Sequence, residues 1–213
     1  MSRQTRALSY LRAAMLIIAL ALPLISLVLL GSHQSVMDGL TKGRAAPLYG
    51  MGELMVIDPI PRQEMVAYLR RRARSGGKQL DEATAGAMYE RSSAVPNFVQ
   101  QVAFAAFEAA PGDVIDDAAV EAGFALIVAR QSSDFAERFE VLADSQKRTL
   151  LALAAAPAER VYTKAFMETV QVANANAVRK ALDVLRGREL VDRRGGRYEV
   201  ANPFLAAWLR GQP

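Results

Sequence analysis

The stretch that decides the fold runs over residues 145–210 and reads SQKRTLLALAAAPAERVYTKAFMETVQVANANAVRKALDVLRGRELVDRRGGRYEVANPFLAAWLR. Its Leu- and Ala-rich beginning predicts a first helix. Thr163 is placed to cap a short second helix, and Asn174 or Asn176 to begin a third. Two short segments follow, joined at Gly195-Gly196, a pair suited to a two-residue hairpin loop that needs positive φ. The stretch therefore predicts three helices and then a β-hairpin.

The third of these helices, expected over 177–187, has one apolar face. Val178, Leu182 and Leu185 recur at helical spacing, and Gly187 is typical of a helix C-terminus. Three helices followed by a hairpin is the order of elements in a winged helix, a fold whose third helix commonly enters the major groove of DNA. The fold class expected for the whole chain is mainly α, with a helical bundle before the winged helix and a small hairpin wing.

Basic and amide side chains occur where a winged helix meets DNA, on the third helix and on the hairpin, or wing. Those on the helix are suited to base edges or flanking phosphates, and those on the wing to phosphates. The candidate DNA contacts are Asn176, Arg179, Lys180, Arg193, Arg194 and Arg197. Many winged helices bind proteins instead, and the fold alone does not decide the partner. DNA and a protein partner therefore both stay open.

The composition excludes some kinds of site. The 213 residues include no cysteine, which excludes disulfides and thiolate metal sites, and one histidine, His33, which excludes a histidine-rich zinc site. The formal net charge is +4 and the sequence pI is about 9.6, values that permit an anionic partner without requiring one. No catalytic residue set and no metal site is predicted.

An apolar run extends over 13–30, broken only by Ser26, with Pro23 in its middle and arginines before it. As a helix it would be about 27 Å long, enough for a thin bilayer. This favours a signal anchor that spans the membrane once, with its N-terminus in the cytoplasm. Alternatively, the half after Pro23 is a buried parallel strand that ends at Gly31-Ser32.

Five segments favour the second alternative, because their order resembles that in a known family. They are LVLLGSHQSVM (27–37), RAAPLYG (44–50), LMVIDPI (54–60), YERSSAVPNFVQ (89–100) and NPFLAAWLR (202–210). The order resembles the C-terminal half of prokaryotic AAA-type ATPases, the archaeal-type ATPases related to the STAND class. In that family a buried strand ends at the sensor 1 position, a helical lid carries the sensor 2 region, and a winged helix follows. The resemblance covers roughly residues 24 to 210.

The resemblance implies nucleotide contacts at Ser32, in the sensor 1 position, and at Pro96 and Asn97, at the start of a lid helix. Complete family members bind ATP with Mg²⁺. This sequence departs from them at Met51, where the family usually has arginine, and at Ala94, which replaces the sensor 2 glycine.

Two larger departures concern the chemistry of ATP hydrolysis. The sequence contains no Gly-x-x-x-x-Gly-Lys-Ser/Thr phosphate loop, and no strand ending in paired acids precedes residue 24. The chain is therefore expected to be a truncated family member that binds no cofactor alone and hydrolyses no ATP.

The middle of the chain predicts the helical lid. One helix, over 63–74, carries Arg70-Arg71-Arg72 opposite an apolar face, Asp81 caps a second, Pro96 opens a third, and a fourth lies within 113–131. The triple arginine is either an anion site or a solvated helix face. The expected domains are an apolar segment at 1–23, a remnant of the nucleotide-binding core at 24–60, the lid at 61–138 and the winged helix at 139–213.

These features lead to two hypotheses about function. The first is a cytoplasmic protein without ATPase activity of its own, whose winged helix contacts DNA or protein. A separate chain that carries the phosphate loop is a further candidate partner. The second hypothesis is an inner-membrane adaptor, held by one transmembrane helix at 13–30, whose remaining residues bind protein.

Overall fold

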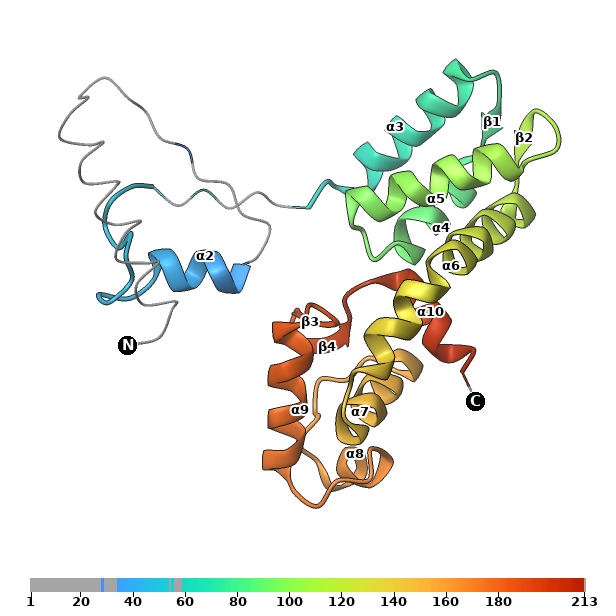
Figure 1. The fold of residues 1–213 in the computed structure, drawn as a ribbon. Helices are drawn as coiled ribbons and strands as arrows, with labels where there is room; N and C mark the ends of the chain where they lie inside the picture. The colour runs from blue at the N-terminus through green and yellow to red at the C-terminus, as the bar shows by residue number, and fades with distance from the viewer. Residues whose placement is uncertain (1–27, 29–33, 54, 56–58, 213) are drawn as a thin grey trace. The chain divides into compact units, whose positions relative to one another are not determined.

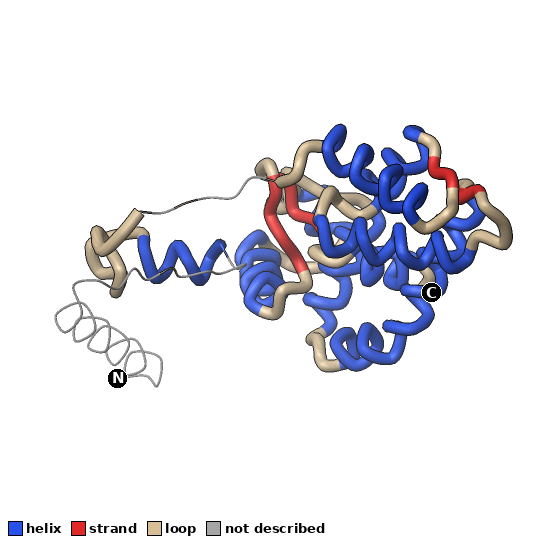
Figure 2. Tube along the Cα trace, turned by 90° about the horizontal axis from the view of Figure 1, so that it is seen from above, coloured by secondary structure: helices blue, strands red, loops and turns tan. Residues whose placement is uncertain are grey.

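The structure is a computed structural model that describes residues 28, 34–53, 55 and 59–212. Over these residues it is mainly helical, as expected, with two pairs of short strands that lie apart from each other among the helices (Figures 1 and 2). The chain forms two compact units, Met1–Asp58 and Pro59–Pro213.

The first unit contains one described helix, α2 (Gln34–Thr41), followed by turns. The amide of Leu48 donates to the carbonyl of Leu40 at 2.8 Å, which folds the turns back on the helix and leaves Leu48 buried. Sequence reasoning did not predict α2. The strand expected at 24–30 lies almost wholly outside the described residues, and so does Ser32.

Four helices at the start of the second unit form a bundle, called the lid below after the expectation from the sequence: α3 (Arg62–Ser75), α4 (Glu82–Arg91), α5 (Pro96–Ala109) and α6 (Asp117–Glu140) (Figure 1). Local chemistry fixes where they begin. Asp81 caps α4 by accepting a hydrogen bond from the amide of Thr84, a bond that also lowers the pKa of Asp81. Pro96 stands in the first turn of α5, where its missing N–H is not needed. Both starts are as predicted.

A pair of parallel strands ties two lid loops together. β1 (Gln79–Leu80) pairs with β2 (Val114–Ile115), and Leu80 lies opposite Ile115. Leu80 and Ile115 are both buried, so the pair anchors the α3–α4 loop beside the α5–α6 loop. Sequence reasoning missed these strands because two residues are too few to show a period.

Helices α5 and α6 approach each other most closely at a glycine. A Cβ on Gly123 would lie 2.6 Å from backbone atoms of Ala105 and Ala106, so any side chain there would push the helices apart. α6 also continues to Glu140, well past the range 113–131 in which it was expected. Its extra turns carry Phe135, which is buried against the C-terminal region.

The C-terminal region contains three further helices and a hairpin in the order expected, and then a last helix that was not predicted: α7 (Asp144–Ala155), α8 (Lys164–Thr169), α9 (Ala175–Gly187), β3 (Val191–Arg194), β4 (Arg197–Val200) and α10 (Pro203–Arg210). The side chains of Thr163 and Asn174 cap α8 and α9. Gly195 and Gly196 have φ of 56° and 86°, and they form the tight turn between the antiparallel strands β3 and β4.

The end of α9 differs from the expectation. Gly187 is the last helical residue and does not adopt a left-handed conformation, whereas Glu189, two residues later, has a φ of 61°. The amide of Leu190 donates to the carbonyl of Leu185 at 2.9 Å, and both side chains are buried. Burial of Leu190 against α9 therefore sets the direction in which the chain leaves the helix.

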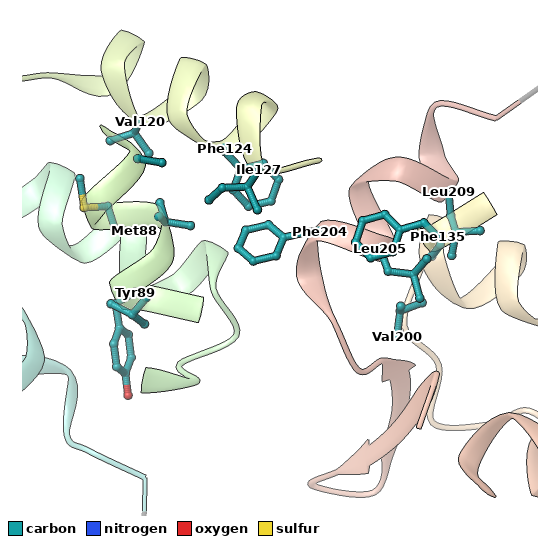
Figure 3. Close-up of a cluster of buried hydrophobic side chains, with 14 of the residues drawn as sticks. Met88, Tyr89, Val120, Phe124, Ile127, Phe135, Val200, Phe204, Leu205 and Leu209 are labelled. Carbon is teal, nitrogen blue, oxygen red and sulfur yellow. The ribbon is translucent and has the colours of Figure 1, made fainter. Parts of the chain in front are cut away.

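One hydrophobic core joins the lid to the C-terminal region. Phe204, at the start of α10, is fully buried. It lies between side chains of the lid and the cluster around Leu205 in the C-terminal region (Figure 3). Its ring centroid lies 5.5 Å from that of Phe98 and 5.1 Å from that of Phe124. Trp208, one turn further along α10, packs on Phe135 of α6 at 6.2 Å. The second unit is thus built around α6 and α10.

Candidate nucleic-acid interface

Helix α9 presents a polar face to solvent. Its apolar face is buried as predicted, which leaves Asn176, Arg179 and Lys180 exposed. Asn174 caps the helix by accepting a hydrogen bond from the amide of Ala177, so the side chain of Asn176 is not needed for capping. Arg179 and Lys180 form no ion pair with any residue that the structure describes. The structure thus brings three of the candidate DNA contacts together on one surface.

Tyr162 lies beside this face and is 45% exposed. Partial burial, and then the neighbouring Tyr198, raise the pKa of the Tyr162 phenol, while Arg179 acts in the opposite direction. The phenol is therefore protonated at neutral pH and can donate or accept a hydrogen bond close to Arg179. Sequence reasoning missed Tyr162, because a lone tyrosine between two helices belongs to no pattern.

The wing, β3 and β4 with their turn, separates Arg193 from Arg194. Successive side chains on a strand point to opposite faces. Arg193 pairs across the hairpin with Tyr198, and its guanidinium carbon lies 5.2 Å from the centroid of the Tyr198 ring. Arg193 and Arg197 are both exposed near the turn. Because Arg197 pairs across the hairpin with Arg194, Arg193 and Arg197 are exposed on opposite faces of the wing, one on each side of its tip.

Arg194 is turned toward the lid. Its Nε donates to the carboxylate of Asp192 at 3.0 Å, and its Nη1 lies 3.5 Å from a carboxylate oxygen of Glu199. The same Nη1 donates to the carbonyl of Ser93, in the turn before α5, at 3.2 Å. Because two carboxylates and a lid carbonyl already contact its guanidinium, Arg194 is less suited than Arg193 to bind a DNA phosphate. The alternation along the hairpin, which places Arg194 on the same face as Asp192 of β3 and Glu199 of β4, is the sequence signal that separates the two arginines.

The carbonyl of Ser93 belongs to a strained turn. Ser93 and Ala94 have φ of 52° and 58°, a region that favours glycine, and Ser92 Oγ is buried without a hydrogen-bond partner among the described residues. Ala94 thus adopts a left-handed backbone at the position where the resembled family has glycine. Pro96 and Asn97 follow at the start of α5, half-buried and exposed respectively.

Of the three candidate nucleotide contacts, Pro96 and Asn97 lie at the start of α5, and Ser32 lies outside the described residues. Within the described ranges, no cluster of three or more His, Asp or Glu side chains is arranged to hold a metal ion. The helices in this part of the chain also include none that is both long and apolar enough to cross a membrane. The apolar run at 13–30 lies, except for Val28, outside this part.

Comparison with known families identifies the C-terminal region. Residues 133–211 match the model of a family described as "Probable winged helix domain". The C-terminal region is a winged helix. The match begins inside α6, so the last turns of this helix belong to the same domain, and β3 and β4 are its wing. A search of curated proteins gave no match.

Among solved structures, the chain is similar to a Walker-type ATPase of Pyrococcus abyssi, with a TM-score of 0.55 and 15% sequence identity. The similarity covers 79% of this chain and 47% of that one, so this chain spans about half the length of that ATPase. At this identity the likeness concerns the fold. The similarity in fold to an ATPase, which the resemblance predicted, is confirmed at that level.

Proposed function

We propose that this chain is the C-terminal portion of an AAA-type, STAND-related ATP-binding protein, and that its winged helix binds duplex DNA. The observation that carries the proposal is the exposed face of α9, where Asn176, Arg179 and Lys180 lie together and neither Arg179 nor Lys180 forms an ion pair among the described residues. One acid, Asp183, is exposed a turn further along the helix. A cationic helix face of this kind suits the major groove and the phosphates that flank it.

The wing has a divided role in this proposal. Arg193 and Arg197 neutralise phosphates beside the groove that α9 enters. Arg194 makes no DNA contact and holds the wing against the lid through the carbonyl of Ser93. Phosphate contacts carry no sequence information, so the wing adds affinity without sequence preference.

The test is fluorescence anisotropy with a labelled duplex of about 20 base pairs at ~50 mM salt, where phosphate contacts are strongest. The double variant Arg179→Gln/Lys180→Gln is expected to bind more weakly than the natural chain. Its plot of log K against log salt concentration is expected to be flatter by about 1.8, or about 0.9 for each lost phosphate contact.

The matched control is Arg71→Gln/Arg72→Gln, which removes the same charge from exposed positions of α3 in the lid. This control is expected to bind the duplex with the affinity of the natural chain and to keep most of the slope of log K against log salt concentration. Equal weakening by the two variants contradicts the proposal, because net charge alone would then explain binding. Absence of binding at ~50 mM salt points to a winged helix that contacts protein.

The proposal also limits what this chain does with nucleotide. Pro96 and Asn97, at the start of α5, are suited to contact a nucleotide that a phosphate loop on other residues or another chain holds, and the sequence given contains no such loop. Isothermal titration of the chain with Mg-ATP is therefore expected to show no binding with a dissociation constant near ~1 μM, which corresponds to a binding free energy of about −8 kcal/mol. A dissociation constant in that range contradicts this part of the proposal.

A further inference from the structure

Two adjoining hollows form a groove between α3 and α5, on the lid. Their volumes are about 420 and 460 Å³, and Tyr68 and Gln100 line both of them. Each helix has 14 residues and therefore spans about 21 Å. The groove is long enough to hold about three to four turns of another helix.

The floor of the groove is apolar and fixed in place. Leu69, Leu80 and Ile115 line its deeper part. Phe107 is held from two sides: a Cβ on Gly76 would lie 2.7 Å from its ring, and Lys78 Nζ lies 4.7 Å from the ring centroid. The same Nζ donates to the carbonyl of Phe107 at 2.6 Å. Because all of these contacts lie within the chain, the hollow does not need a bound partner to keep its shape.

Phe104 lines the same groove from α5 and is 67% exposed. One exposed apolar residue needs no explanation, but an exposed phenylalanine next to an apolar hollow extends it into a continuous patch. The opposite side of the groove, α3, is basic. Arg62 and Arg70 pair with Glu90 and Glu82.

The remaining arginines of α3 lack such partners. Arg71, Arg72 and Arg74 are exposed and form no ion pair with any residue that the structure describes. Arg72 lines the deeper hollow together with Glu108 of α5, and Arg71 lines the adjoining one together with Glu64 of α3. The three arginines without an ion pair outnumber these two acids, so a net positive charge lies along α3 beside the apolar floor. Such a groove complements a ligand that is apolar on one face and acidic on the other.

We propose that this groove binds an amphipathic helix with acidic flanks, supplied by a partner protein. Such helices place apolar side chains at every third or fourth position into a groove of this kind. Nucleic acid fits less well, because phosphates gain nothing from the apolar floor around Leu69 and Phe107. A second copy of the chain fits less well too, since symmetric pairing through this face would set the α3 arginines against each other. The inference does not depend on DNA binding by α9.

The experiment uses two labelled peptides of about 14 residues with Leu at every third or fourth position, one with Glu and the other with Lys at the remaining positions. Anisotropy with the full chain is expected to show that the Glu peptide binds at least about tenfold more tightly than the Lys peptide. Phe104→Ala, at an exposed position, is expected to weaken binding of the Glu peptide by about tenfold while circular dichroism stays unchanged. Arg71→Gln/Arg72→Gln is expected to weaken it and to reduce its salt dependence.

The matched control is Arg179→Gln/Lys180→Gln, which removes the same charge from α9 and is expected to leave peptide binding unchanged. The proposal is overturned by similar affinities for the two peptides, by no binding of either peptide, by an equal loss of Glu-peptide affinity in the α9 and α3 variants, or by no effect of Phe104→Ala. Displacement of the Glu peptide from the α9 variant by short duplex DNA also overturns it, and assigns the α3 face to nucleic acid.

Discussion

Helices α5 and α6 of the lid meet at Gly123, Ala105 and Ala106, whereas the helices of the winged helix meet at leucine and valine side chains. In the lid, two backbones touch because side-chain atoms are absent. In the winged helix, large side chains such as Leu153 and Leu182 fill the space between helices. The lid should therefore be most sensitive to added atoms. The winged helix, and the junction that Phe204 makes with the lid, should be most sensitive to removed ones.

The largest effect is expected for Phe204→Ala, at this junction. Phe204 is fully buried and packs on Phe98 and Phe124 of the lid. Its truncation leaves a cavity between two regions that share one core, and we expect the free energy of unfolding in urea to fall by about 3 to 5 kcal/mol. The control is Phe104→Ala, at an exposed position of α5, which is expected to change it by less than about 0.5 kcal/mol. Similar losses in the two variants would mean that Phe204 does not join the regions.

The second effect tests the close approach in the lid. Gly123→Ala places a methyl group 2.6 Å from the backbone of α5, so the helices must separate, and we expect a loss of about 2 kcal/mol despite the better helix propensity of alanine. Gly187→Ala is the matched control, since Gly187 is also helical and a Cβ there meets nothing within 4 Å. It is expected to raise the free energy of unfolding by up to about 1 kcal/mol. Thermal unfolding, monitored by circular dichroism, shows whether Gly123→Ala lowers the stability and Gly187→Ala raises it.

The same contrast explains which parts of the fold the sequence predicted. The helices α7 to α9 and the hairpin begin or end at residues with their own chemistry, such as Thr163, Asn174 or Gly195-Gly196, and short-range pattern was enough to find them, whereas α10 was not predicted. In the lid, Asp81 and Pro96 were found in the same way. The β1–β2 pair and the last turns of α6 depend on partners far away in the sequence, and a single sequence contains no local signal for them.

The residues of the candidate DNA surface were predicted or missed for the same reason. Asn176, Arg179 and Lys180 were predicted together because helical spacing places them away from the apolar face of α9. Tyr162 was missed, since it approaches α9 from a loop. Arg194 was grouped with Arg193 on charge alone, although the alternation along the hairpin places it beside Asp192 and Glu199. Its contact with Ser93, in a distant turn, has no local signal in the sequence.

The smallest effect is expected for Arg194→Gln, compared with Arg193→Gln. Arg194 is partly exposed, so losing its ion pairs with Asp192 and Glu199 should cost about 0.5 to 1 kcal/mol. The more specific consequence is local, because Arg194 is the wing residue that donates to the carbonyl of Ser93. Hydrogen exchange at the amide of Ala94, which donates to the carbonyl of Tyr89 at 3.0 Å, is expected to become faster in Arg194→Gln and to stay unchanged in Arg193→Gln.

DNA binding should show the reverse order for this pair. Arg193→Gln removes an exposed charge from the wing and should flatten the salt slope by about 0.9, whereas Arg194→Gln removes a charge that two carboxylates already neutralise. If both variants weaken DNA binding equally, Arg194 reaches the DNA and its contact with the lid is secondary. If Ala94 exchanges at the same rate in both variants, the wing and the strained turn of the lid are not coupled through this arginine.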